Sequence, residues 1–352
     1  MTIKEALGRL TQGESLAEEE MADVMREVMS GQATAAQIGA LLALLRLKGE
    51  TVDELTGCAR AMRELATPVV SRRKELLDTC GTGGDGRGTF NISTAAAFVA
   101  AGAGLAVAKH GNRAITSQAG SADVLEALGV SLDLTAQELG ECLDEVGMAF
   151  LFAPALHPTM RHAAGPRREL GVRTIFNLLG PLTNPAGATC QVVGVAAAEW
   201  TEMLGQVLLR LGVRRAMVVH SLDGVDEISL TAETKVTEVK GGRLLTRYLS
   251  PEELGFRRLP PETLRGGTPA ENAALIRRIL EGEKGPQRDV VVVNAAAALV
   301  VGGAADSLAE GVARAEEALD SGRARRKLEE LVCFTQECAR RKSRMAEGGA
   351  LA

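Results

Sequence analysis

The sequence predicts an α/β protein with a small helical N-terminal domain and a large domain built on a mostly parallel central sheet flanked by helices. Two observations predict this fold. Residues 1–67 show only helical patterns, whereas from about residue 75 short, continuous apolar runs alternate with helical segments. Such alternation is typical of parallel strands joined by helices that cover both faces of a sheet. We therefore expect domains at residues 1–68 and 69–352.

Composition limits the class of function. Of 352 residues, 46% are hydrophobic, which is enough for a substantial core. The net charge of −5 and the 3% aromatic content argue against a nucleic-acid partner. The six cysteines form no C-x-x-C pair, as expected for a reducing compartment. No segment approaches the roughly 20 apolar residues of a membrane span, so we expect a cytoplasmic protein without a membrane partner.

The N-terminal helices are predicted from periodicity and caps. Leu16–Ser30 and Ala33–Lys48 are periodic and each stops at a glycine, and Thr51 with Glu54 forms a capping box for a helix that ends near Pro68. Their leucine, alanine and methionine content exceeds what these helices can bury among themselves. We therefore expect this domain to pack against another domain or a second subunit, as in a homodimer.

The larger domain is predicted from short apolar runs. Capping boxes open helices after Thr135, Thr268 and Ser307, and residues 231–248 indicate a hairpin around Gly241–Gly242. The expected strands are Glu75–Cys80, Gly104–Lys109, Ala149–Phe152, Cys190–Val195, Ala216–His220 and Asp289–Asn294.

The central feature is a glycine-rich loop between the first of these strands and a helix. The stretch from Asp78 to Thr94 reads DTCGTGGDGRGTFNIST and holds five glycines within eight residues. Glycine lets the backbone approach a ligand closely, and N–H groups at a helix N-terminus bind anions. The loop therefore indicates a phosphate or pyrophosphate site, the alternative being a flexible turn.

Two other phosphate-binding motifs resemble this loop and are disfavoured. Gly81, Gly83 and Gly86 match G-x-G-x-x-G, but a dinucleotide fold needs an acidic residue where the second strand ends, and Lys109–His110 stands there. A P-loop needs Lys–Ser/Thr where this chain has Arg87–Gly88.

The loop after the second strand, Lys109–Asp123, offers cations and hydroxyls for a further phosphate. The alternatives are a solvated lysine at position 109 and a plain helix cap at Ser121. Because ligands of open α/β sheets bind beyond the C-terminal strand ends, this loop and the glycine loop are expected at one edge.

Carboxylates follow the strand that ends at His220. Asp223, Asp226 and Glu227 lie in HSLDGVDEISL, and adjacent carboxylates suit Mg²⁺ together with substrate phosphates. The alternative is an acidic turn around Gly224.

A basic cluster lies in the middle of the chain. Arg167, Arg168 and Arg173 follow His157 and His162, whose spacing does not predict a zinc site. An arginine fork here suits a substrate carboxylate, the alternative being a solvated helix end. No nucleophile–His–acid set predicts covalent hydrolysis.

These motifs together resemble the anthranilate phosphoribosyltransferase family. The matching stretches are DTCGTGGDG, FNIST, KHGNRA, GSADVLEALG, RRELGVRTIFNLLGPLTNP, the Asp226–Glu227 pair and NAAAAL, and they run from residue 78 to about 299. The resemblance implies transfer of phosphoribosyl from phosphoribosyl pyrophosphate to the amine of anthranilate, with Mg²⁺ as cofactor. It also implies a homodimer through the helical domain, onto which a middle segment, about 157–185, would pack.

The resemblance implies roles for individual residues and no firm catalytic acid or base. Phosphoribosyl pyrophosphate would contact Gly81, Thr82, Gly83, Gly84, Asp85, Thr89, Asn91, Ser93, Thr94, Lys109 and Ser117. Anthranilate would contact Gly81, His110, Asn112 and Arg167, and Mg²⁺ would be held by Ser93, Asp226 and Glu227. A pyrimidine nucleoside phosphorylase and a non-catalytic nucleic-acid-binding relative remain as alternatives.

Overall fold

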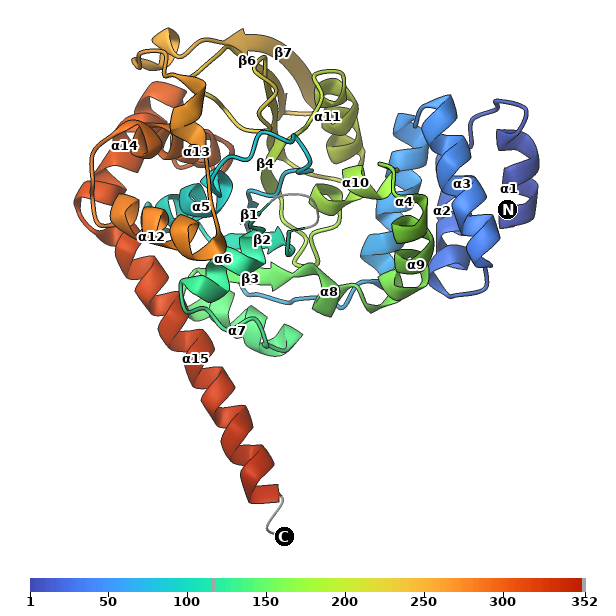
Figure 1. Ribbon diagram of the computed structural model, residues 1–352, viewed down its shortest axis with the longest axis horizontal. Coiled ribbons are helices and arrows are strands. Elements are labelled where there is room, and N and C mark those ends of the chain that lie inside the picture. The colour runs from blue at the N-terminus through green and yellow to red at the C-terminus, as the bar shows by residue number, and fades with distance from the viewer. Residues whose placement is uncertain (115–117, 350–352) are drawn as a thin grey trace.

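The computed structural model describes residues 1–114 and 118–349, with the side chains described up to residue 344. A bundle of helices at the N-terminus lies beside an α/β body, and a long C-terminal helix extends away from that body (Figure 1). The bundle comprises α1 (Ile3–Leu10), α2 (Glu18–Met29), α3 (Ala35–Lys48) and α4 (Val52–Leu65). The predicted capping box of Thr51 and Glu54 is confirmed at the start of α4.

One seven-stranded sheet forms the centre of the body, in the order β3-β2-β1-β4-β5-β6-β7. The first five strands in this order are parallel, and β6 and β7 continue the sheet as an antiparallel hairpin. The order reverses at β1, whose neighbours β2 and β4 lie on opposite sides, and open sheets bind ligands at such a switch point. The strands are β1 (Leu77–Asp78), β2 (Val107–Gly111), β3 (Met148–Phe152), β4 (Cys190–Gly194), β5 (Arg215–Ser221), β6 (Thr234–Lys240) and β7 (Arg243–Leu249).

Helices cover both faces of the sheet. α5 (Ile92–Gly102) and α13 (Pro286–Val301) pack together on one face, and α11 (Trp200–Arg210) packs on the other against β5 and β6. The remaining α-helices are α6 (Ser121–Ala127), α7 (Ala136–Glu145), α8 (Ala153–Leu156), α9 (Arg161–Leu170), α10 (Phe176–Leu179), α12 (Pro269–Leu280), α14 (Leu308–Asp320) and α15 (Arg323–Gly349). Short 3₁₀ turns occupy Pro158–Met160, Gly180–Leu182, Glu252–Leu254 and Pro261–Leu264.

The alternation of side chains along the strands divides the apolar interior into two cores. Val192 and Met217 face the core that contains α5 and α13, whereas Val193 and Val218 face the core that runs through α11 into the helical bundle. Successive residues of a strand point to opposite faces, so neighbouring valines pack into different cores. The middle segment joins the second core, because α9 packs on α2 and α3, and α10 packs on α4.

The predicted strand at Asp289–Asn294 is wrong. These residues lie inside α13, which begins with Pro286 at its first turn and is buried on nearly every side. A short apolar run cannot by itself distinguish a buried strand from a fully buried helix, and four successive valines favoured the strand. The alanines from Ala295 onward and the proline at the start were the signals for one continuous helix.

The other expected strands are confirmed, with ends that differ by at most three residues, and so is the hairpin at residues 231–248. β1 is the shortest, since only Leu77 and Asp78 pair before the glycine loop begins. Within the described residues, no helix combines the length and the apolar character that crossing a bilayer requires.

Candidate active site

A cleft of about 680 Å³ lies where the C-terminal strand ends meet the middle segment. Its walls come from the glycine loop, the end of β2, residues Asp226 and Glu227, α4, α9 and α10. Fifteen of the sixteen site residues expected from the sequence line it; the sixteenth, Ser117, lies outside the described residues. The fifteen are Gly81, Thr82, Gly83, Gly84, Asp85, Thr89, Asn91, Ser93, Thr94, Lys109, His110, Asn112, Arg167, Asp226 and Glu227.

The glycine loop has a defined geometry. Gly83, Gly84, Gly86 and Gly88 have φ between +63° and +78°, a region that other residues rarely adopt. A Cβ on Gly81 would lie 3.0 Å from the carbonyl oxygen of Gly194, which also accepts a 2.8 Å hydrogen bond from the Thr82 N–H. The end of β4 thus fixes the start of the loop, and the plain flexible-turn alternative does not describe this arrangement.

Two carboxylates lie beside this loop. Asp226 accepts a 3.1 Å hydrogen bond from the Gly83 N–H, and Glu227 accepts one of 3.2 Å from the Ser93 N–H at the start of α5. Both side chains retain some exposure to the cleft but are surrounded by protein on most sides. This burial, together with the neighbouring acidic groups, raises the pKa of both carboxyls above their usual range.

Asp85 and Asp223 differ in their relation to this pair. Asp85 lines the cleft, and its carboxylate accepts from the Arg87 N–H and lies 3.5 Å from the Asp226 N–H. Asp223 instead accepts from the Val225 N–H and from the hydroxyls of Ser229 and Thr231, so it closes its own loop. The acidic-turn alternative therefore holds for Asp223, while Asp226 and Glu227 reach the cleft.

Lys109 is buried, with 2% of its surface exposed, and the solvated-lysine alternative is wrong. Its ammonium group donates to the carbonyl oxygen of Thr79 at 2.8 Å, to the Thr79 hydroxyl at 3.1 Å and to the Ser93 hydroxyl at 3.3 Å. An ammonium group has three donors. Lys109 thus orients Ser93 and places a positive charge beneath the cleft.

Asn91 and Thr94 lie at the start of α5. The Asn91 amide donates to the Ala119 carbonyl at 3.1 Å and accepts from Asn272 at 2.9 Å. The buried Thr94 hydroxyl has no hydrogen-bond partner among the described residues. The loop at 109–123 is closed by Asp123, which accepts from the Gly120 and Ala114 N–H groups, whereas Asn112 remains exposed on the cleft wall.

Two buried histidines lie side by side on the cleft wall, with ring centroids 5.3 Å apart. His110 Nδ1 lies 3.0 Å from the Gly180 carbonyl oxygen. Because a carbonyl can only accept, Nδ1 carries the proton and Nε2 is an acceptor, left without a partner among the described residues. Burial lowers the pKa of His110 to about 3 and that of His157 to about 4, so both imidazoles are neutral near pH 7.

Arg167 presents a cation to the cleft without a neutralising partner. Its guanidinium lies over the Phe176 ring, 4.8 Å from the ring centroid. Burial lowers the pKa of this guanidinium, which nevertheless stays charged. In the part of the chain whose side chains are described, no carboxylate pairs with it, so an anionic ligand would supply the missing charge. Its neighbour Arg168 points to solvent and does not line the cleft.

Comparisons with known proteins show the family to which the chain belongs. Two family models match, "Glycosyl transferase family, helical bundle domain" over residues 4–66 and "Glycosyl transferase family, a/b domain" over residues 73–325. An anthranilate phosphoribosyltransferase from Pelotomaculum thermopropionicum is 58% identical over 333 residues, covering 95% of this chain and 96% of that protein. The chain belongs to the anthranilate phosphoribosyltransferase family.

Solved structures of the anthranilate phosphoribosyltransferase family share the fold. The structure from Thermus thermophilus has a TM-score of 0.90 and 52% identity, covering 94% of this chain and 99% of that one. A structure from Saccharomyces cerevisiae in complex with PRPP and Mg has a TM-score of 0.87 at 26% identity, covering 95% and 98%. A further S. cerevisiae structure, in complex with 4-fluoroanthranilate, has a TM-score of 0.86 at 25% identity with the same coverage.

Within this family framework, sequence reasoning did not assign several residues that line the cleft or contact its lining residues. His157 was considered only as a zinc ligand, and Thr79 and Phe176 were not singled out, although they contact Lys109 and Arg167. The signal for Phe176 was its place in the TIFNLL stretch after the arginines. Nothing in the sequence indicates that His110 and His157, 47 positions apart, pack ring against ring.

The buried state of His157 gives a pH-dependent prediction for stability. Its folded pKa, about 4, lies below the ordinary 6.5, so between these values the unfolded chain binds a proton that the folded chain does not. This favours unfolding as the pH falls. At pH 5 the contribution amounts to about 2 kcal/mol. Asp78, with a pKa raised to about 6 by burial, has the opposite effect on stability as the pH falls. The contribution of His157 is therefore measured as the difference in stability loss between wild type and a variant without this imidazole.

We expect wild type to lose about 2 kcal/mol more than His157→Phe between pH 7.5 and pH 5.0, measured by urea denaturation. Equal losses in the two proteins would contradict the neutral, buried assignment of this imidazole.

Proposed function

We propose that this chain transfers the phosphoribosyl group of phosphoribosyl pyrophosphate to the amine of anthranilate, releasing pyrophosphate. The observation that carries the proposal is the joint lining of one cleft by a glycine loop, two carboxylates and an unneutralised arginine. These groups suit a pyrophosphate, a cation and a carboxylate in turn. The complexes with PRPP and Mg and with 4-fluoroanthranilate formed by a relative support the choice of substrates.

Phosphoribosyl pyrophosphate is assigned to the strand-end loops. The backbone N–H groups of residues 81–85 would hold the pyrophosphate, and the first turn of α5, with Asn91, Ser93 and Thr94, would hold the phosphoribosyl part. Thr89 and Lys109 complete the proposed set, Lys109 through the Ser93 hydroxyl that it contacts at 3.3 Å. Ser117 is proposed from the resemblance alone, since it lies outside the described residues.

The carboxylate pair fits Mg²⁺. Glu227 uses one oxygen for the Ser93 N–H and makes no other hydrogen bond among the described residues, and carboxylate and hydroxyl oxygens are hard ligands of the kind that Mg²⁺ prefers. Ser93, Asp226 and Glu227 would hold the ion. When bound, Mg²⁺ supplies positive charge that stabilises the pyrophosphate leaving group.

Anthranilate is assigned to the opposite wall, where Arg167 would bind its carboxylate and Gly81, His110 and Asn112 would surround the ring. The amine is neutral near pH 7 and needs only to be positioned for attack on the ribose carbon. His110 Nε2 can accept a hydrogen bond, but with a pKa of about 3 it is too weak a base to remove a proton near pH 7. We therefore assign no general base.

The assay that tests this function follows the fluorescence of anthranilate. Purified protein should consume anthranilate only when phosphoribosyl pyrophosphate and Mg²⁺ are both present. Phosphate-dependent cleavage of a pyrimidine nucleoside would instead identify the phosphorylase alternative, and the transferase names of the relatives disfavour it.

We further propose that the chain divides into a helical domain, residues 1–68 with the middle segment of about 157–185, and an α/β domain made of the remainder. The packing of α9 on α2 and α3 supports this division. A cytoplasmic location is also proposed, from the six dispersed cysteines described above.

A homodimer through the helical domain is proposed because α3 is apolar on both sides. Leu41 and Leu45 are buried within the bundle, whereas Ala36, Ala40 and Leu47 form an outward stripe, and Leu47 is 84% exposed. An exposed apolar stripe on a surface helix is typical of an interface. If the α3 faces of two protomers pair symmetrically, the apolar stripe of each protomer is buried against the other.

Leu47→Glu is expected to dissociate this dimer. Loss of about 2 kcal/mol of burial from each of two symmetric leucines weakens the dimer by about 4 kcal/mol, or roughly 1,000-fold in Kd. Light scattering after size exclusion should show a dimer for wild type and for the control Leu245→Glu, at an exposed position on β7. A monomeric wild type would refute the dimer.

A further inference from the structure

α13 contains a single polar side chain within a long apolar run. Between Val290 and Val301 every residue except Asn294 is valine, alanine or leucine. Asn294 is only 3% exposed, and a buried carboxamide without partners costs free energy. Its partners therefore indicate why an amide is present at this position.

The Asn294 side chain is hydrogen-bonded to a backbone segment that lies 66 residues earlier in the sequence. Its Oδ1 accepts a 3.0 Å hydrogen bond from the Ile228 N–H, and its Nδ2 donates to the Ile228 carbonyl oxygen at 2.8 Å. The second amide hydrogen is donated to the Val290 carbonyl oxygen, at 2.9 Å, within α13. Asn294 thus pairs with both polar groups of Ile228, as a neighbouring strand would.

Ile228 directly follows the two carboxylates of the proposed metal site. On the opposite side, β4 confines the same segment, because a Cβ on Gly194 would lie 1.6 Å from the Asp226 carbonyl oxygen. The tripeptide Asp226–Glu227–Ile228 is therefore held between the end of β4 and the middle of α13. Few arrangements of this backbone remain once both contacts are made.

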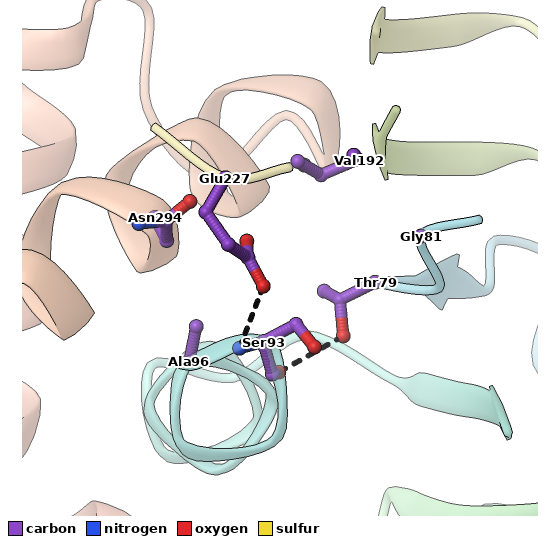
Figure 2. A pocket seen from close by; sticks show the side chains of 8 residues that line it. Thr79, Gly81, Ser93, Ala96, Val192, Glu227 and Asn294 are labelled. Carbon is purple, nitrogen blue, oxygen red and sulfur yellow. Dashed lines mark hydrogen bonds between the residues drawn. The ribbon is translucent and has the colours of Figure 1, made fainter. Parts of the chain in front are cut away.

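The Glu227 side chain extends from this anchored backbone and makes one hydrogen bond among the described residues, with the Ser93 N–H. A cavity of about 10 Å³, lined by Glu227, Ser93 and Asn294 among others, lies between α5 and α13 (Figure 2). Figure 2 shows the carboxyl group directed at the Ser93 N–H, with Asn294 on the neighbouring helix. The carboxylate position therefore follows from the backbone position, this hydrogen bond and the residues around the cavity.

We propose that Asn294 is a positioning residue that fixes the backbone of Ile228 and thereby sets the carboxylates of Asp226 and Glu227 for Mg²⁺. The inference rests on the proposed function and assigns a role to the NAAAAL stretch that the cleft itself does not use. It predicts an effect confined to metal-dependent binding, since Asn294 lies outside the wall of the main cleft.

The test measures binding of phosphoribosyl pyrophosphate by isothermal titration calorimetry, with saturating Mg²⁺ and with EDTA. Asn294→Ala removes all three hydrogen bonds. Asn294→Ser can keep the bond to the Val290 carbonyl, as serine does within helices, and loses the pair with Ile228. Thr335→Val is the matched control, because the buried Thr335 hydroxyl accepts from the Ser131 N–H, in a loop that does not line the cleft.

Both Asn294 variants should bind phosphoribosyl pyrophosphate about tenfold or more weakly with Mg²⁺, a size typical for groups that support metal ligands. In EDTA they should match wild type, and Thr335→Val should match wild type in both conditions. If Asn294→Ala does not fold, Asn294→Ser alone decides.

A folded Asn294→Ser with unchanged affinity in Mg²⁺, or with equal loss in Mg²⁺ and EDTA, would overturn the positioning role. If wild type binds phosphoribosyl pyrophosphate neither with Mg²⁺ nor in EDTA, the proposed function itself is overturned.

Discussion

Arg167→Ala is expected to raise the KM for anthranilate by about 10- to 100-fold and to change the KM for phosphoribosyl pyrophosphate by less than threefold. A hydrogen-bonded charge pair contributes about 1.5–3 kcal/mol, and the Arg167 guanidinium has no competing carboxylate among the described side chains. The contact with the Phe176 ring, whose centroid lies 4.8 Å away, holds the planar guanidinium group of Arg167 in one orientation. Steady-state kinetics with each substrate varied in turn measures the effect.

One further variant separates charge from geometry in this test, and a second variant is the control. Arg167→Lys keeps the charge but not the planar fork, so it should fall between wild type and Arg167→Ala. Arg168→Ala is the control, since Arg168 is the next residue on α9 and is exposed outside the cleft. Equal rises in both KM values for Arg167→Ala would refute the assignment of anthranilate to this wall.

Glu227→Gln is expected to lower kcat/KM for phosphoribosyl pyrophosphate by about 100-fold at 1 mM Mg²⁺. The substitution removes a negative charge from the proposed metal site, where the ion stabilises the leaving pyrophosphate by several kcal/mol. The amide can still accept from the Ser93 N–H, which lies 3.2 Å from the present carboxylate. The loss should therefore arise from the metal and should diminish as the Mg²⁺ concentration rises.

The control for this substitution is Glu233→Gln, an acidic residue whose ion pair with Arg258 is half exposed. It should retain wild-type kinetics. A Glu227→Gln enzyme whose activity is reduced equally at all Mg²⁺ concentrations would show that Glu227 acts through structure rather than through the ion.

Local chemistry was enough to predict much of the site. Glycines, a helix start and adjacent carboxylates each have a meaning that depends on a few neighbouring residues, and the rule for parallel sheets places their loops at one edge. Positions Gly81, Ser93 and Glu227 meet in the structure for this reason. The resemblance added the individual assignments, such as Arg167, that spacing alone left open.

Other features depend on tertiary contacts that a single sequence does not contain. Lys109 reads as a solvated cation or a phosphate ligand until its bonds to Thr79 and Ser93 are seen. Asp223 resembles its acidic neighbours, but its hydrogen bonds to Ser229 and Thr231 turn it inward. In both cases, residues nearby in space decide the role.

The misassigned strand at Asp289–Asn294 has the same cause. Its valines fit a buried strand, and only the packing of α13 against α5, β4 and β5 makes a helix that is apolar on all sides stable. Because of this error the role of Asn294 was not predicted. An asparagine at a strand end suggests a loop residue rather than a side chain that hydrogen-bonds to a backbone far away in the sequence.

The central claim is that one cleft holds phosphoribosyl pyrophosphate at the strand ends and anthranilate against α9. Crystals grown with Mn²⁺, phosphoribosyl pyrophosphate and an anthranilate analogue test it most directly, because Mn²⁺ gives an anomalous signal. The account predicts a peak beside Asp226 and Glu227, pyrophosphate density over the 81–85 loop, and a carboxylate on Arg167. Metal bound away from both carboxylates, or an analogue bound away from Arg167, would contradict it.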